Sequence, residues 1–124
     1  MSVSTKIVID GGKNSVVTLS GSLREDIASP SLVLKFEDLA MKPKSVRIDA
    51  VVFAIQEKMG VVLWWELDKE RELILPLESR GRFNFEEIQG LHSPKEGVLG
   101  ISMSTFEWKA PVKHFLIMLD LTKQ

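Results

Sequence analysis

The run at residues 61–68 limits the possible folds more than any other stretch of the sequence. Every second residue of the first part is large and apolar: Val61, Leu63, Trp65 and Leu67. A β-strand places these side chains on one face, and we expect that face to lie in the core. The opposite face also begins apolar, with Val62 and Trp64. We therefore expect a strand covered on both faces over its first half, by its own chain or by a neighbouring subunit.

Seven other segments alternate with the same period of two. They cover residues 6–9, 15–21, 31–36, 45–56, 72–77, 97–106 and 112–121. Turn-forming residues recur roughly every 8–12 positions, and no long segment has the period of an amphipathic helix. The length of 124 residues is typical of one domain. We predict a single all-β domain over residues 1–124, a jelly-roll-like antiparallel β-sandwich of about eight strands, with an up-and-down barrel as the alternative.

Two local irregularities refine the strand predictions. The apolar phase slips within residues 45–56, which predicts a bulge near Asp49 or Ala50. Pro76 has no amide hydrogen to donate to a neighbouring strand. The strand that contains it is therefore expected to lie at the edge of a sheet or to end there.

Two connections are predicted from their length and composition. Residues 57–60 form a short turn, so the strands before and after them are expected to be antiparallel neighbours. Residues 79–94 have no strong strand pattern and are predicted to form an ordered, loop-like flap. One helical turn is expected within it, at residues 86–89.

Composition excludes several classes of function. The 16 basic and 17 acidic residues are interspersed and give a formal net charge of −1, which disfavours nucleic-acid binding. The absence of Cys excludes disulfides and thiolate chemistry and fits synthesis in a reducing cytoplasm. Residues 1–6 lack the layout of a signal peptide, and no apolar run approaches the roughly 20 residues that span a bilayer. We expect a soluble protein without a membrane partner.

No group of residues in the sequence predicts catalysis. The two histidines, His92 and His114, are far apart and have no metal-binding spacing. Three carboxylates could share one strand face and hold a hard cation such as Ca²⁺: Glu66, Asp68 and Glu70. The basic residues between and after them favour a solvated hairpin end instead. No nucleophile elbow or phosphate loop occurs. We predict a protein that is not an enzyme and needs no metal or cofactor.

The three tryptophans are the side chains most relevant to binding. Trp65 is expected to be core, because its neighbours in phase are apolar. Trp64 has three alternatives: packing under a loop of its own chain, contact with another subunit, or stacking on a ligand. A carbohydrate-binding module, in which Trp64 or Trp108 stacks on a sugar ring, is therefore one hypothesis for function.

The last two-thirds of the chain resembles a group of phage proteins. The features that carry the resemblance are a proline-ended strand, an aromatic turn, a Gly-Leu loop before a proline, a glycine-bearing strand and a terminal strand of alternating leucines: residues 75–77, 81–85, 90–94, 97–101 and 116–123. In this order they resemble small virion proteins of tailed marine bacteriophages. The resemblance implies a structural or capsid-decoration protein of the head, neck or tail, located in the virion, and it supplies no catalytic residues.

Self-association and docking to other virion proteins would be the mechanism of such a protein. The second faces of two strands are apolar and are the expected contact surface: Val62, Trp64, Leu116 and Met118. The flap at residues 83–94 is expected to shape the rim of this surface. We therefore expect a homo-oligomer that buries apolar sheet surface when it assembles.

Overall fold

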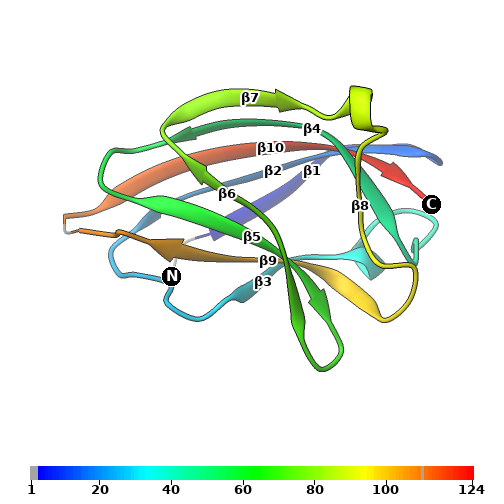
Figure 1. Cartoon of the computed structure of the whole chain (residues 1–124), viewed down its shortest axis with the longest axis horizontal. Helices are drawn as coiled ribbons and strands as arrows, with labels where there is room; N and C mark the ends of the chain where they lie inside the picture. The colour runs from blue at the N-terminus through cyan, green and yellow to red at the C-terminus, as the bar shows by residue number, and fades with distance from the viewer. Residues whose placement is uncertain (1–2, 110) are drawn as a thin grey trace.

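A computed structural model describes residues 3–109 and 111–124 as two antiparallel β-sheets packed face to face (Figure 1). The ten strands are β1 (Val3–Asp10), β2 (Asn14–Leu23), β3 (Ser31–Lys35), β4 (Val46–Ile55), β5 (Gly60–Leu67), β6 (Arg71–Glu78), β7 (Arg80–Asn84), β8 (Leu91–His92), β9 (Val98–Phe106) and β10 (Lys113–Lys123). Two 3-10 turns, η1 (Phe36–Asp38) and η2 (Glu86–Ile88), complete the elements. The prediction of an all-β sandwich is confirmed.

The strand order divides the chain between a six-stranded and a four-stranded sheet. The six-stranded sheet has the order β1-β2-β10-β4-β7, with β8 also paired to β4, and the four-stranded sheet has the order β3-β9-β5-β6. The pairing is nested along the chain: β5 pairs with β6, β4 with β7, β3 with β9 and β2 with β10. The chain therefore folds as one long hairpin that is wrapped into two layers.

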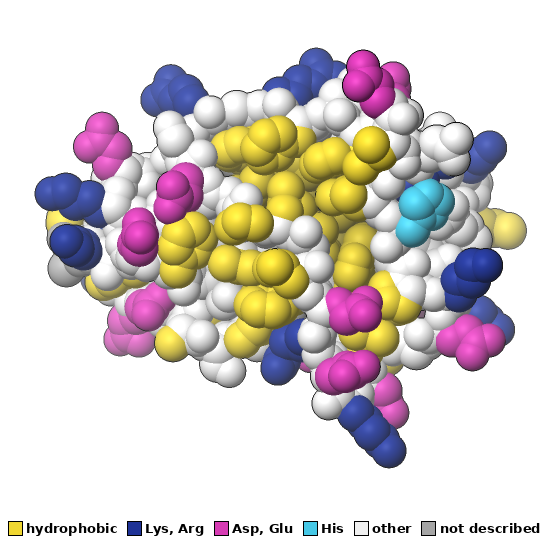
Figure 2. All heavy atoms as spheres, in the orientation of Figure 1, with side chains coloured by type: hydrophobic (Ala, Val, Ile, Leu, Met, Phe, Trp, Pro, Cys, Tyr) yellow, Lys and Arg dark blue, Asp and Glu magenta, His cyan; other side chains and the backbone are white. Residues whose placement is uncertain are grey.

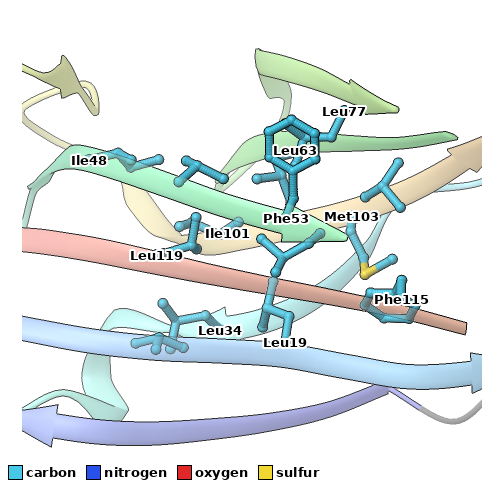
Figure 3. Close-up of a cluster of buried hydrophobic side chains, with 14 of the residues drawn as sticks. Leu19, Leu34, Ile48, Phe53, Leu63, Leu77, Ile101, Met103, Phe115 and Leu119 are labelled. Atoms are coloured by element: carbon cyan, nitrogen blue, oxygen red, sulfur yellow. The ribbon is translucent and has the colours of Figure 1, made fainter. Parts of the chain in front are cut away.

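The core lies between the two sheets and receives side chains from both (Figure 3). Leu19 and Leu119 enter it from the six-stranded sheet, and Leu63 and Ile101 enter it from the four-stranded sheet. Burying one such side chain stabilises the fold by roughly 1.5–3 kcal/mol. Trp65 is only 4% exposed and packs edge-on against Phe36, with ring centroids 6.5 Å apart. The prediction that Trp65 is core is confirmed.

All eight predicted strands are present, and two irregularities lie where they were predicted. Ile48 pairs with Leu121 and Ala50 with Asp120, so Asp49 is the extra residue of a bulge in β4. Because of this bulge, the inward-facing side chains of β4 change from even-numbered to odd-numbered positions. Pro76 lies in β6, which is the edge strand of the four-stranded sheet, as expected.

The prediction for residues 57–60 is wrong. β4 belongs to the six-stranded sheet and β5 to the four-stranded sheet, so the turn carries the chain from one layer to the other. The two strands it joins are not hydrogen-bonded neighbours. A short turn with a glycine fits a hairpin and a crossing between layers equally well, and only the long-range pairing of each strand distinguishes them.

The flap prediction for residues 79–94 is only partly right. The segment contains β7 and β8. Both pair with the edge of β4 that faces away from β10, and together they form one edge strand interrupted by η2. The predicted helical turn is present as η2 (Glu86–Ile88). Within the described residues, no helix is long and apolar enough to cross a membrane.

The two open sides of the sandwich differ. On one side the sheets touch, because the Thr5 hydroxyl of β1 donates a hydrogen bond to the carbonyl oxygen of Val33 in β3, at 2.6 Å. On the other side lie the edge strands β6 and β7, and no strand pairing joins them in the described part of the chain. The inner face of β7 is therefore left without a complete cover.

Candidate functional site

The four predicted contact residues lie on two different surfaces. Val62 and Trp64 are on the outer face of the four-stranded sheet, because they alternate with buried residues of β5. Leu116 and Met118 are on the outer face of the six-stranded sheet, because they alternate with buried residues of β10. These faces point away from each other, so the four side chains do not form one contact surface. Periodicity identified the outward residues but did not identify the sheet to which each strand belongs.

Trp64 is half-buried and is partly covered by its own sheet. Its indole nitrogen donates a hydrogen bond to the Ser104 hydroxyl of β9, at 3.0 Å. Its cross-strand neighbours are Ser102 on one side and Leu73 on the other. The small serine side chains of β9 leave room for the indole ring above them. Trp64 is thus held by contacts within the chain, while part of its surface stays accessible.

Leu116 and Met118 have apolar neighbours across β4. Leu116 pairs with Ala54, and Met118 pairs with Val52. Leu116 is 49% exposed and Val52 is 37% exposed. We call these four residues the outer strip. It is a narrow apolar surface in the middle of the six-stranded sheet.

Trp108 and Trp64 do not form a shared platform for a sugar. The Trp108 ring packs against the core, and its indole nitrogen is buried without a hydrogen-bond partner among the described residues. Trp64 instead lies on the outer face of the four-stranded sheet. Both rings are partly accessible, but they lie in different parts of the molecule, so a ligand could stack on only one of them at a time.

Of the predicted carboxylate candidates, Glu66 makes structural contacts, and so do both histidines. Glu66 accepts a hydrogen bond from Ser102 at 3.0 Å and forms an ion pair with Arg71 at 2.6 Å. The His114 ring contacts the Ser22 hydroxyl at 2.7 Å. Within residues 3–109 and 111–124, no group of three or more acidic, histidine or cysteine side chains could hold a metal ion.

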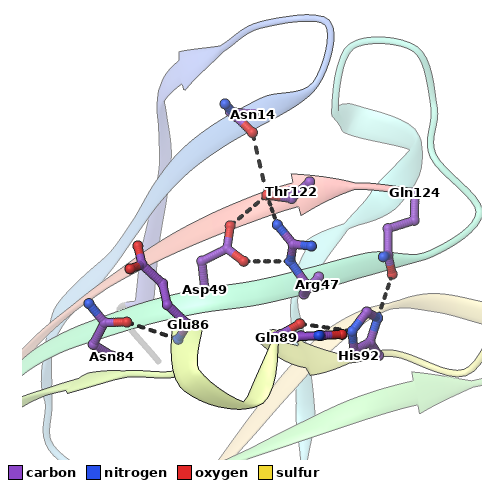
Figure 4. A network of polar contacts seen from close by, with 9 residues as sticks. All are labelled: Asn14, Arg47, Asp49, Asn84, Glu86, Gln89, His92, Thr122 and Gln124. Atoms are coloured by element: carbon purple, nitrogen blue, oxygen red, sulfur yellow. Dashed lines mark hydrogen bonds and ion pairs between the residues drawn. The ribbon is translucent and has the colours of Figure 1, made fainter.

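A polar network ties the β8 region to the C-terminal strand (Figure 4). The Arg47 guanidinium pairs with Asp49 at 2.6 Å and donates to the Thr122 hydroxyl at 3.2 Å. The Thr122 hydroxyl donates to Asp49 at 2.5 Å. The His92 ring contacts the side-chain oxygen of Gln124 at 3.0 Å. These side chains satisfy one another, and the network stabilises the bulged end of β4.

A partly exposed aromatic cluster around Phe83 was not predicted as a surface. Phe83 shares the inner face of the six-stranded sheet with Val51, yet it is 44% exposed, whereas Val51 is fully buried. Its ring lies 5.3 Å from that of Phe53 and 6.1 Å from that of Phe85. Its exposure is consistent with the place of β7 at the edge of the six-stranded sheet.

Hydrophobic side chains continue from this cluster toward β6 and β5 (Figure 2). We define the open-side surface as the apolar residues that are at least partly accessible in β6, in β7, in η2 and at the position between β7 and η2: Ile74, Leu75, Phe83, Phe85 and Ile88. Basic side chains lie along β7, and acidic ones lie at η2 (Figure 2). The sequence signal for this surface is the aromatic pair at positions 83 and 85, which lies within the segment predicted to be a flap.

Two comparisons of the sequence with known proteins give no match. A scan against models of protein families finds none that fits this chain, and a search of curated proteins finds no similar sequence.

Proposed function

We propose that this chain is a structural protein of a phage particle that works by binding a second copy of itself and other virion proteins. Two features support the proposal. The resemblance of the last two-thirds of the chain to virion proteins supports a role as a particle component. The nested pairing of β2 to β10 fits the connectivity of a jelly roll, an architecture that viral capsid domains use.

The observation that carries self-association is the combination of a free strand edge with exposed aromatic side chains. β7 is the terminal strand of its sheet, and all five of its residues are exposed. A free edge can pair with an extended strand of another chain, and exposed apolar side chains beside it add buried area. Phe83 combines these two features: its backbone belongs to the free edge strand β7, and its exposed side chain faces the open side.

A second copy fits this edge because its charges are self-complementary. Arg80 and Arg82 begin the segment, and Glu86 and Glu87 follow it. An antiparallel two-fold arrangement brings the basic end of one copy to the acidic end of the other. The contact would then be isologous, and the six-stranded sheet would continue from one copy into the next.

The register that fits best has the two-fold axis at Phe83. A register centred on Arg82 would place two arginines directly opposite each other, which is destabilising. With the axis at Phe83, each Phe83 faces its counterpart, and Arg80 lies opposite Glu86 of the second copy. Covering the exposed parts of Phe83, Phe85 and Ile88 in both copies contributes roughly 5–10 kcal/mol before the cost of association is subtracted.

The first test is the mass of the protein in solution over a range of concentrations, measured by light scattering. We expect a dimer, and we expect Phe83→Glu to give a monomer with an unchanged circular dichroism spectrum. Leu116→Glu and Trp64→Glu are matched controls on the two outer faces and should leave the mass unchanged. A wild-type monomer at high concentration, or a Phe83→Glu dimer, would contradict the proposal.

A charge exchange tests the two-fold geometry separately. Arg80→Glu should weaken the dimer about tenfold, because it places two carboxylates together. Adding Glu86→Arg to that variant should restore the affinity, since the pair is then reversed. If the double variant is as weak as the single one, these two residues do not meet across the interface.

Carbohydrate binding is the competing function, because jelly rolls also occur in lectin domains. It predicts that sugars change the fluorescence of Trp64 and that Trp64→Ala abolishes this change. A protein that binds sugars and stays monomeric would replace the proposal.

A further inference from the structure

One end of the sandwich contains a concave site that the proposed self-association does not use. It has a volume of about 700 Å³ and lies between the loop from η1 to β4 and the loop from β8 to β9. Pockets of roughly 300–1,000 Å³ are typical of small-molecule sites. Residues from three separate stretches of sequence line it: 32 with 35–37, 42–44 and 95–99.

The rim of this cavity is rich in lysine. Four lysines line it, together with two glutamates: Lys35, Lys42, Lys44, Lys95, Glu37 and Glu96. Three ion pairs occur in the described part of the chain, and none of them involves these lysines. The chain as a whole has a formal net charge of −1, so this local excess of two positive charges is a distinct feature. A concave site with such an excess attracts anions.

The wall of the cavity is apolar, and a bulge in β9 exposes part of it. Leu67 pairs with Val98 and Glu66 pairs with Gly100, so Leu99 is the extra residue of the bulge. Leu99 is 50% exposed and lines the cavity with Leu32 and Pro43. A ligand there would meet apolar side chains and lysines at the same time.

We propose that this cavity, the lysine pocket, binds a small amphiphilic anion. The acid group would be held by the lysines, and the apolar body would lie against Leu32 and Leu99. A neutral apolar ligand would leave the lysine charges uncompensated. A polyanion such as a nucleic acid would be repelled by the two glutamates and would make no favourable contact with the apolar wall. The combination of both chemistries in one cavity therefore favours an organic carboxylate, sulfonate or phosphate with a hydrocarbon portion.

The test uses octanoate as the probe, with acetate and octan-1-ol as partial ligands. Calorimetry and ligand-observed NMR with the whole chain should give saturable binding of one octanoate per chain. Acetate lacks the apolar body and octanol lacks the charge, so each should bind at least tenfold more weakly. The absence of saturable octanoate binding would overturn the proposal, as would octanol binding of equal strength.

Variants locate the site. Leu99→Glu places a carboxylate in the lysine pocket and should weaken octanoate binding more than tenfold. Leu116→Glu introduces the same change at a residue with almost the same exposure, 49% against 50%, on the other sheet. It should bind octanoate like the wild type. If both variants bind equally well, or if Lys35→Ala with Lys95→Ala has no effect, the ligand does not occupy this cavity. These readouts are independent of the mass of the protein, so they do not test the proposed dimer.

Discussion

At the scale of single residues, Asp10 joins both ends of the chain. Its carboxylate receives hydrogen bonds from the Lys123 ammonium at 2.7 Å, the Ser15 hydroxyl at 2.9 Å and the Ala40 amide at 2.9 Å. The hydrogen bond from Lys123 is the largest cause that lowers the pKa of Asp10, and desolvation partly opposes it. Asp10 thus connects the turn after β1 to the last strand.

The direction of that pKa shift predicts a dependence of stability on pH. Because the pKa of Asp10 is lower in the folded state than in the unfolded state, its stabilising effect is present above the unfolded pKa of about 3.9 and is lost as pH falls through the folded pKa. We expect Asp10→Asn to lower the free energy of unfolding at pH 7. The difference from wild type should shrink below pH 4. Urea denaturation across this range measures it, with Asp38→Asn as an exposed control; a difference that is independent of pH would contradict the role of the charge.

Gly90 and Gly97 allow two effects of a side chain to be separated. Both have positive φ, 86° and 75°. A Cβ at Gly90 would lie 2.2 Å from the Arg47 side chain, whereas a Cβ at Gly97 would have no atom within 4 Å. Gly97→Ala should therefore cost only the backbone strain, about 1 kcal/mol, and Gly90→Ala should cost about 1 kcal/mol more because it displaces Arg47 from Asp49. Thermal or urea unfolding of both variants measures the loss of unfolding free energy. Equal losses in the two variants would mean that Arg47 can move aside without a loss of stability.

At the scale of elements, the strands that could be predicted are those with a run of apolar side chains in the local sequence. In β2, β5 and β10 this run buries alternate residues, whereas β1 was predicted from its apolar residues although none of its residues is buried. β7 could not be predicted in this way, because all five of its residues are exposed and two of them are arginines. β8 has only two residues. Strands of this kind exist because β4 offers a free edge to pair with, and that is a tertiary effect.

The assignment of strands to sheets could not be derived from local pattern either. Val62 and Leu116 are outward residues with similar neighbours in sequence, yet they lie on opposite sides of the molecule. Periodicity reports the face of a strand and contains no information about its partner. The lysine pocket has the same origin, since Lys35, Lys42 and Lys95 come from three distant segments that only the folded chain brings together.

At the scale of the whole molecule, self-association and folding should be coupled. If the folded chain is a dimer and the unfolded chain is a monomer, a higher protein concentration favours the folded state. A hundredfold rise in concentration adds about 1.4 kcal/mol per chain and should raise the Tm by roughly 5 °C for a domain of this size. Differential scanning calorimetry measures this shift directly.

The Phe83→Glu variant separates association from stability in the same measurement. Its Tm can differ from that of the wild type, because part of the aromatic cluster with Phe53 and Phe85 is lost. Its Tm should nevertheless be independent of concentration, since the monomer has no association step to shift. A wild-type Tm that does not change with concentration would show that the open-side surface is not covered by a second copy. In that case the free edge of β7 would be left for a different protein, and the mass of mixed complexes would be the quantity to measure.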